Sequence, residues 1–150
     1  MDSMSETKRQ MYGSNLIAVC IDQMKDGDYS GSIWNQYEET ARSFTGSMEL
    51  VQRIDRLLDE LHFPERATMP RSFDGEVETY NAAPRLTQSQ VMEMGALAEK
   101  RGRIATFIVR VKYRQNATWQ GEAMYVEKAQ KADFISALEF IRLIDEAVKQ

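Results

Sequence analysis

Residues 105–149 decide the fold, and they read ATFIVRVKYRQNATWQGEAMYVEKAQKADFISALEFIRLIDEAVK. Residues 15–59, which read NLIAVCIDQMKDGDYSGSIWNQYEETARSFTGSMELVQRIDRLLD, align with them without a gap at an offset of 90 positions. Six aligned pairs are identical, among them Gly31 with Gly121. At many other aligned positions both residues are apolar. In the earlier part of each segment these positions alternate as in a strand, and in the later part they have helical spacing. The sequence therefore predicts an internal duplication of one β-β-β-α unit.

The expected fold class is α+β, with antiparallel strands and helices packed on one face of the sheet. The expected organisation is a flexible N-terminal arm over 1–14, a first unit over 15–61, an irregular connector over 62–104 with a helix near 87–101, and a second unit over 105–150. One such unit alone would bury too little surface to be stable, so the two units should pack on each other in one compact domain, or on a second chain. The duplication already supplies an internal partner for each unit, and a homodimer is the alternative that the sequence leaves open.

The pairing within each hairpin follows from the side-chain pattern. A five-residue loop over 114–118 places Val111 opposite Gly121, and Tyr113 opposite Trp119, with apolar side chains on one face. The same register predicts these further pairs: Phe107 with Tyr125, Val109 with Ala123, Arg110 with Glu122 and, in the first unit, Ile21 with Gly31 and Val19 with Ile33. The glycines are expected to leave room for neighbouring aromatic rings.

The last helix has a clear start signal. Ser136 and Glu139 form a capping box, in which the serine side chain accepts an amide hydrogen bond at the helix start. In the first unit Gly46 replaces the serine while Glu49 remains, so we expect a weaker cap there.

Composition limits the class of protein. The 150 residues are 43% apolar and 28% charged, with a net charge of −4, which disfavours general nucleic-acid affinity. Cys20 is the only cysteine, which excludes an internal disulfide and fits a reducing compartment. No signal peptide or membrane-spanning segment is evident, so a cytoplasmic protein without a membrane partner is expected.

No residue pattern indicates catalysis, a cofactor or a metal. His62 is the only histidine and lacks the regularly spaced partner ligands of a metal site. Cys20 lies between apolar residues of a strand, where structural packing is the usual role of a free cysteine. Asp55 and Asp145 recur in both units, but they fall on amphipathic helices where charged residues normally face water.

A basic stripe is the strongest functional signal in the sequence. Six cationic residues and no acidic residue fall within residues 100–114. The expected partner-binding residues are Arg101, Arg103, Arg110, Lys112, Arg114, Gln115 and Asn116. Such a stripe could hold phosphates or an acidic protein surface. The alternative is a solvated strand face with a cross-strand pair between Arg110 and Glu122.

The octapeptide RQNATWQG, residues 114–121, followed by Phe134 and by Ser136-Ala137-Leu138-Glu139, resembles a set of small uncharacterised proteins from Firmicutes and their mobile elements. Arg71-Ser72-Phe73 resembles the same set. This resemblance covers most of the chain and implies no activity. A looser resemblance, in the order of elements alone, is to HicB-type antitoxins, which implies a small β-β-β-α regulatory module.

Two hypotheses of function follow. The first is a non-enzymatic regulatory protein that contacts a protein partner, such as a mobile-element inhibitor of a host defence system of the anti-CRISPR kind. Exposed sheet edges formed by the third strands could accept a strand of that partner. The second is a nucleic-acid-binding accessory protein that uses the basic stripe, whose binding should weaken steeply with salt. A HicB-like antitoxin and an enzyme are the less favoured alternatives.

Overall fold

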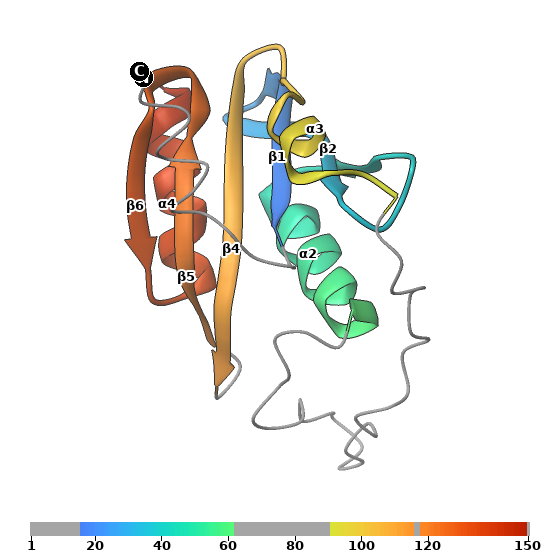
Figure 1. Ribbon diagram of the computed structural model, residues 1–150. Coiled ribbons are helices and arrows are strands. Elements are labelled where there is room, and N and C mark those ends of the chain that lie inside the picture. Colours follow the sequence, from blue (N-terminus) through green and yellow to red (C-terminus); the bar gives the residue numbers. More distant parts are fainter. Residues whose placement is uncertain (1–15, 62–90, 116–117, 150) are drawn as a thin grey trace.

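The computed structural model describes residues 16–61, 91–115 and 118–149 (Figure 1). Its elements are β1 (Ile17–Lys25), β2 (Asp28–Asn35), β3 (Arg42–Thr45), α2 (Ser47–Leu61), α3 (Met94–Ala98), β4 (Ala105–Gln115), β5 (Thr118–Tyr125), the 3-10 turn η1 (Val126–Lys128), β6 (Gln130–Phe134) and α4 (Ala137–Val148). The strands form one antiparallel sheet in the order β3-β2-β1-β4-β5-β6. The expected α+β class is therefore correct.

The predicted hairpin register is confirmed over most of its length. Val111 lies opposite Gly121, and every other predicted pair up to that point is present in both hairpins. The register then shifts by one residue in each hairpin, between Ile21 and Gln23 and between Val111 and Tyr113. These β-bulges fall at corresponding positions of the two hairpins.

The bulge in β4 overturns one predicted pair. Tyr113 lies opposite Gln120, and Arg114 lies opposite Trp119. Because a bulge adds one residue to one strand, it reverses which side chains face the core beyond it. Tyr113 is consequently 56% exposed, whereas Arg114 is buried.

Gly31 of β2 and Gly121 of β5 lie where the backbone of the neighbouring strand comes very close. A Cβ on Gly31 would collide with the carbonyl oxygen of Cys20, and a Cβ on Gly121 with that of Arg110. The prediction that these glycines make room for aromatic rings is therefore wrong, because the space is occupied by the backbone of the neighbouring strand.

Two apolar clusters lie on opposite faces of the sheet. The larger cluster joins β1 and β4 to α2 and α4, with Ile54 and Ile144 fully buried. Both the first and the second half of the chain contribute to it, as expected for one compact domain. On the other face α3 places Leu97 against Ala18 and Ile108. The long helices therefore share one face, as predicted, and α3 covers part of the other (Figure 1).

The two long helices begin in different ways. The Ser136 hydroxyl accepts the Glu139 amide at 3.0 Å, which confirms the serine half of the capping box. At the start of α2, Gly46 has no side chain, and the Asp28 carboxylate accepts the Ser47 amide at 3.0 Å instead. A residue from the preceding hairpin thus supplies the missing cap.

The connector is only partly described. Within 91–101 the helix is limited to α3, which is shorter than the helix expected near 87–101. The arm over 1–14 and the remainder of the connector, with His62 and the segment Arg71-Ser72-Phe73, lie outside the described residues.

Candidate functional site

The basic stripe is reorganised around one buried carboxylate. Glu122 is 3% exposed and lies 4.0 Å from Arg110, 3.4 Å from Lys112 and 2.8 Å from Lys131. The Arg110–Glu122 pair was expected from the register, whereas Lys131 of β6 was not part of the predicted stripe. Cross-strand pairing places all four side chains on the sheet face opposite α2 and α4.

The charge of Glu122 is stabilised by its neighbours. Burial alone would raise the pKa of this carboxyl group, but the hydrogen bond from Lys131 and the charges of Lys131, Lys112 and Arg110 hold it below the ordinary value of 4.5. The cluster thus retains an ionised carboxylate that draws the cations toward itself and reduces their availability to a partner.

Arg114 is not part of an exposed stripe, which corrects the sequence-based prediction. Its guanidinium lies 2.7 Å from the Asp59 carboxylate and 3.3 Å from that of Asp55, with a side chain only 2% exposed. The Trp119 indole nitrogen donates to the same Asp55 at 3.3 Å. The expectation that Asp55 simply faces water is also wrong, since this residue ties α2 to the second hairpin.

Among the remaining predicted site residues, Arg101 and Arg103 make contacts of their own before β4 begins. The Arg101 guanidinium donates to the carbonyl oxygens of Ala98 and Lys100, and Arg103 binds Asp22 through its backbone amide. These residues precede β4, whereas Gln115 ends it. Asn116 lies outside the described residues, as does the Gln115 side chain.

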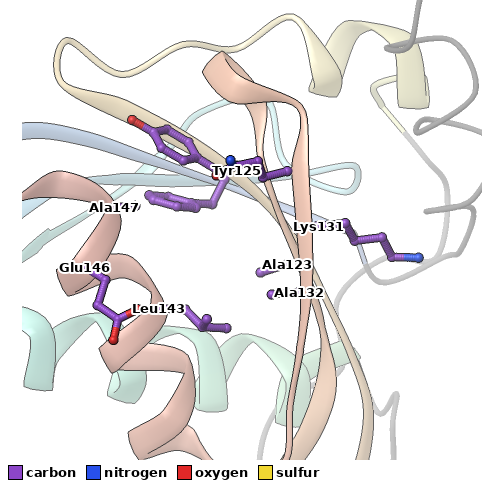
Figure 2. A pocket seen from close by; sticks show the side chains of 9 residues that line it. Ala123, Tyr125, Lys131, Ala132, Leu143, Glu146 and Ala147 are labelled. Atoms are coloured by element: carbon purple, nitrogen blue, oxygen red, sulfur yellow. The ribbon is translucent and has the colours of Figure 1, made fainter. Parts of the chain in front are cut away.

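A cavity of about 370 Å³ lies between α4 and the outer strands of the second unit (Figure 2). Phe107 and Tyr125 form one wall, with ring centroids 5.1 Å apart. The other lining residues come from β5, β6 and α4: Ala123, Gln130, Lys131, Ala132, Leu143, Glu146 and Ala147. Figure 2 shows the Lys131 side chain directed away from Leu143, consistent with its ion pair to Glu122 on the other face. The lining is thus mainly apolar.

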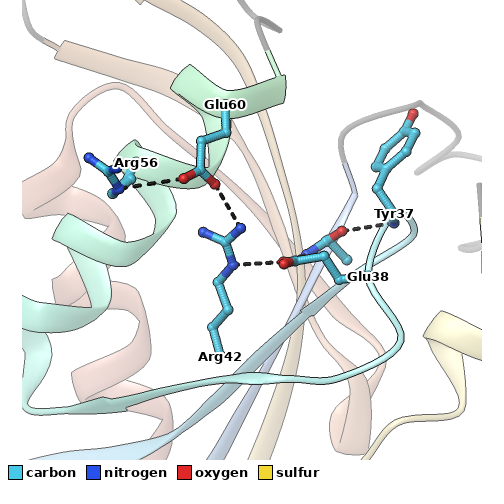
Figure 3. Close-up of polar contacts among 6 residues, drawn as sticks. Tyr37, Glu38, Arg42, Arg56 and Glu60 are labelled. Carbon is cyan, nitrogen blue, oxygen red and sulfur yellow. Dashed lines mark hydrogen bonds and ion pairs between the residues drawn. The ribbon is translucent and has the colours of Figure 1, made fainter. Parts of the chain in front are cut away.

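The corresponding region of the first unit has different side chains, and Figure 3 shows one of them, Arg42, between Glu38 and Glu60. Positions 90 residues before the three cavity alanines are occupied by Ile33, Arg42 and Leu57. Arg42 binds the Glu38 carboxylate at 2.6 Å and the Glu60 carboxylate at 2.7 Å. Arg42 therefore bridges the loop before β3 to the end of α2.

Exposed apolar side chains follow β6 in the chain. Ile135 and Leu138, just after the strand, are 67% and 66% exposed. Among the described residues, no strand pairs with the outer side of β6. A strand edge and exposed apolar side chains are the features with which sheets accept extended partners.

Cys20 does not have the surroundings of a reactive thiol. It is buried, and burial together with Asp22 and Glu127 raises the pKa of its thiol to about 11. The thiolate, which is the nucleophilic form, is therefore disfavoured.

The described ranges contain no cluster of three or more histidine, cysteine, aspartate or glutamate side chains that could hold a metal ion. Within them, no helix has the length and apolar character needed to cross a membrane. Comparisons with protein-family models, with curated proteins and with solved structures found no significant match to this chain.

Sequence reasoning did not find the cavity residues. Alanine gives almost no positional signal in a sequence, because it is compatible with strands, helices and either face. The alignment of the two units at an offset of 90 holds a usable signal. In it Ile33, Arg42 and Leu57 align with Ala123, Ala132 and Ala147. Lys131 could have been found from the pairing of β6 with β5, which places it on the same face as Glu122.

Proposed function

We propose that this chain is a non-enzymatic binding protein that recognises an extended segment of a protein partner at the outer edge of β6. The observation that carries the proposal is the exposure of Ile135 and Leu138, which directly follow this strand in the chain. A segment paired with β6 would gain main-chain hydrogen bonds from the strand and apolar contacts from these two side chains.

The opposite edge of the sheet is less suited to this role. Arg42 at the start of β3 is held by two carboxylates, and β3 has four residues where β6 has five. Thr45 occupies the position equivalent to Ile135, so only Met48, 69% exposed, offers a large apolar side chain there. Short edge strands and polar edge residues disfavour pairing with another chain.

The sequence resembles small proteins of Firmicutes and their mobile elements. Because mobile elements carry inhibitors of host defence, we propose a component of a host defence system as the partner. The nucleic-acid alternative loses support from the burial of Arg114 and from the carboxylate among Arg110, Lys112 and Lys131. It is the alternative outcome of the test below.

We also propose that the two β-β-β-α units arose by duplication. The hairpin registers correspond at an offset of 90, and the bulges fall at equivalent sites. The central strands add support, because Ala18 pairs with Ile108, the residue 90 positions later. A twofold axis between two equivalent strands produces this pairing.

The test is capture of a partner from host lysate, with and without nuclease, by the wild type and by two matched double variants. Ile135→Lys with Leu138→Lys alters the β6 side, and Thr45→Lys with Met48→Lys introduces the same charges at the equivalent positions of the first unit. We expect a nuclease-resistant protein to be captured by the wild type and the first-unit variant and lost with the β6 variant. Equal capture by both variants contradicts the β6 assignment, and a nuclease-sensitive catch that falls with salt favours nucleic acid.

A further inference from the structure

We propose that the cavity between α4, β5 and β6 is an anchor pocket for one large apolar side chain of the partner, with aromatic side chains preferred. This inference rests on the proposed function, because it assigns the side chain to a segment that pairs with β6.

The position of β6 connects the edge to the pocket. Ala132 and Lys131 both line the cavity, but the ammonium group of Lys131 reaches Glu122 on the other face of the sheet. A strand added outside β6 would lie about 4.8 Å away, and its alternate side chains would fall beside Ala132 on the cavity side. Because alanine ends at Cβ, it leaves the path from the edge into the cavity less obstructed than any longer side chain would.

The lining determines the chemistry of the occupant. Phe107 and Tyr125 are stacked with an interplanar angle of 26°, so their rings form a broad apolar wall. Leu143 and the alanines add further apolar surface, and Gln130 and Glu146 contribute polar groups. A cavity of about 370 Å³ with this lining favours an aromatic or large aliphatic group over a polar one.

The first unit carries larger side chains at the equivalent positions. Arg42 occupies the position of Ala132, and Leu57, which is fully buried, occupies that of Ala147. Introducing a leucine at either alanine should therefore fill the pocket from β6 or from α4 while leaving the backbone of the edge unchanged.

The experiment uses the full chain and two synthetic peptides, acetyl-Thr-Val-Thr-Phe-Thr-Val-Thr-amide and the same peptide with alanine in place of phenylalanine. Binding is followed by NMR, from the shifts of the β6 amides and of the Leu143 methyl groups. We expect both sets of signals to respond to the phenylalanine peptide, with affinity at least about ten-fold above that of the alanine peptide. Ala132→Leu and Ala147→Leu should each remove this preference, whereas Asp133→Asn, on the other face of β6, should keep it.

The outcomes separate the pocket from the edge. Equal binding of both peptides at the β6 amides would overturn the anchor pocket and leave the edge function standing. A response of the Leu143 methyl groups without any change at the β6 amides would overturn the proposed binding at the β6 edge. It would also overturn the proposal that the side chain in the pocket belongs to a segment paired with β6. Retention of the preference in both folded leucine variants would also overturn the pocket.

Discussion

The β2–β3–α2 region and the β5–β6–α4 region have corresponding strand pairing but differ in how the space under the helix is filled. In the first, Ile33, Arg42 and Leu57 fill it, and Arg42 bridges two carboxylates. In the second, alanines stand at the equivalent positions and a cavity remains. The difference teaches that two hairpins with corresponding strand register can carry side chains of very different volume under their helices.

Exchanging residues between the two regions should have the largest effect. Leu57→Ala removes a fully buried side chain, so we expect unfolding to become easier by about 4 kcal/mol. The reciprocal change, Ala147→Leu, adds a side chain where space exists and should stabilise by about 0.5 kcal/mol. Urea denaturation of the two variants measures both values. A large loss of stability with Ala147→Leu would show that the cavity cannot accommodate a larger side chain.

Breaking the ion pairs between β4 and α2, which join the first region to the middle of the sheet, should rank second. Arg114→Glu places a carboxylate beside Asp55 and Asp59, so we expect a loss of about 3 kcal/mol. Arg110→Glu is the matched control on the same strand, at a side chain 28% exposed, and should cost about 1 kcal/mol. Thermal unfolding monitored by circular dichroism distinguishes them, and equal losses would contradict the structural role assigned to Arg114.

The glycines test whether the two hairpins are equivalent. Gly31→Ala and Gly121→Ala each force a Cβ against the backbone of the neighbouring strand, so each should cost about 2 kcal/mol. Similar losses support equivalent bulges, and chemical denaturation gives both numbers. If only one variant is destabilised, the hairpins differ in how they relax.

Acid should give the smallest effect, and it concerns one carboxylate in each region. The pKa of Glu122 is lowered because Lys131, Lys112 and Arg110 outweigh the effect of burial, and that of Glu38 is lowered because hydrogen bonds from Arg42 and Asn35 outweigh it. A folded-state pKa below the unfolded value of 4.5 stabilises the protein above pH 4.5, and this contribution is lost as pH falls through the folded-state pKa.

Glu122→Gln and Glu38→Gln should therefore each flatten the acid side of the stability profile. Denaturation midpoints between pH 3 and pH 7 measure this slope, with Glu49→Gln as an exposed control on α2. An unchanged slope in either variant would mean that its carboxylate does not contribute to acid sensitivity.

The sequence predicted the sheet well where a regular alternation applied. Val109, Val111 and Gly121 follow the period of a half-buried strand, and their pairing was correct. The prediction failed after Val111, because a bulge depends on the close approach of two backbones and has no fixed side-chain signature. That single shift reversed the positions of Tyr113 and Arg114.

The candidate site was less predictable than the fold. The basic stripe was identified from charge alone, and charge does not indicate which cations meet a buried carboxylate such as Glu122. The cavity depends on what Ala123, Ala132 and Ala147 lack, and missing volume becomes visible only when the surrounding elements are placed.

The central pairing of β1 with β4 affects how the protein is made on the ribosome. The first half of β1 is buried on both faces of the sheet. Its partner toward the middle of the sheet, β4, is synthesised about 90 residues later. At translation rates of roughly 5–20 residues per second, the inner edge of β1 lacks that partner for roughly 5 to 20 seconds. During that interval the first half of the nascent chain has an open apolar strand edge, and completion of the sheet depends on a contact distant in sequence, which slows folding.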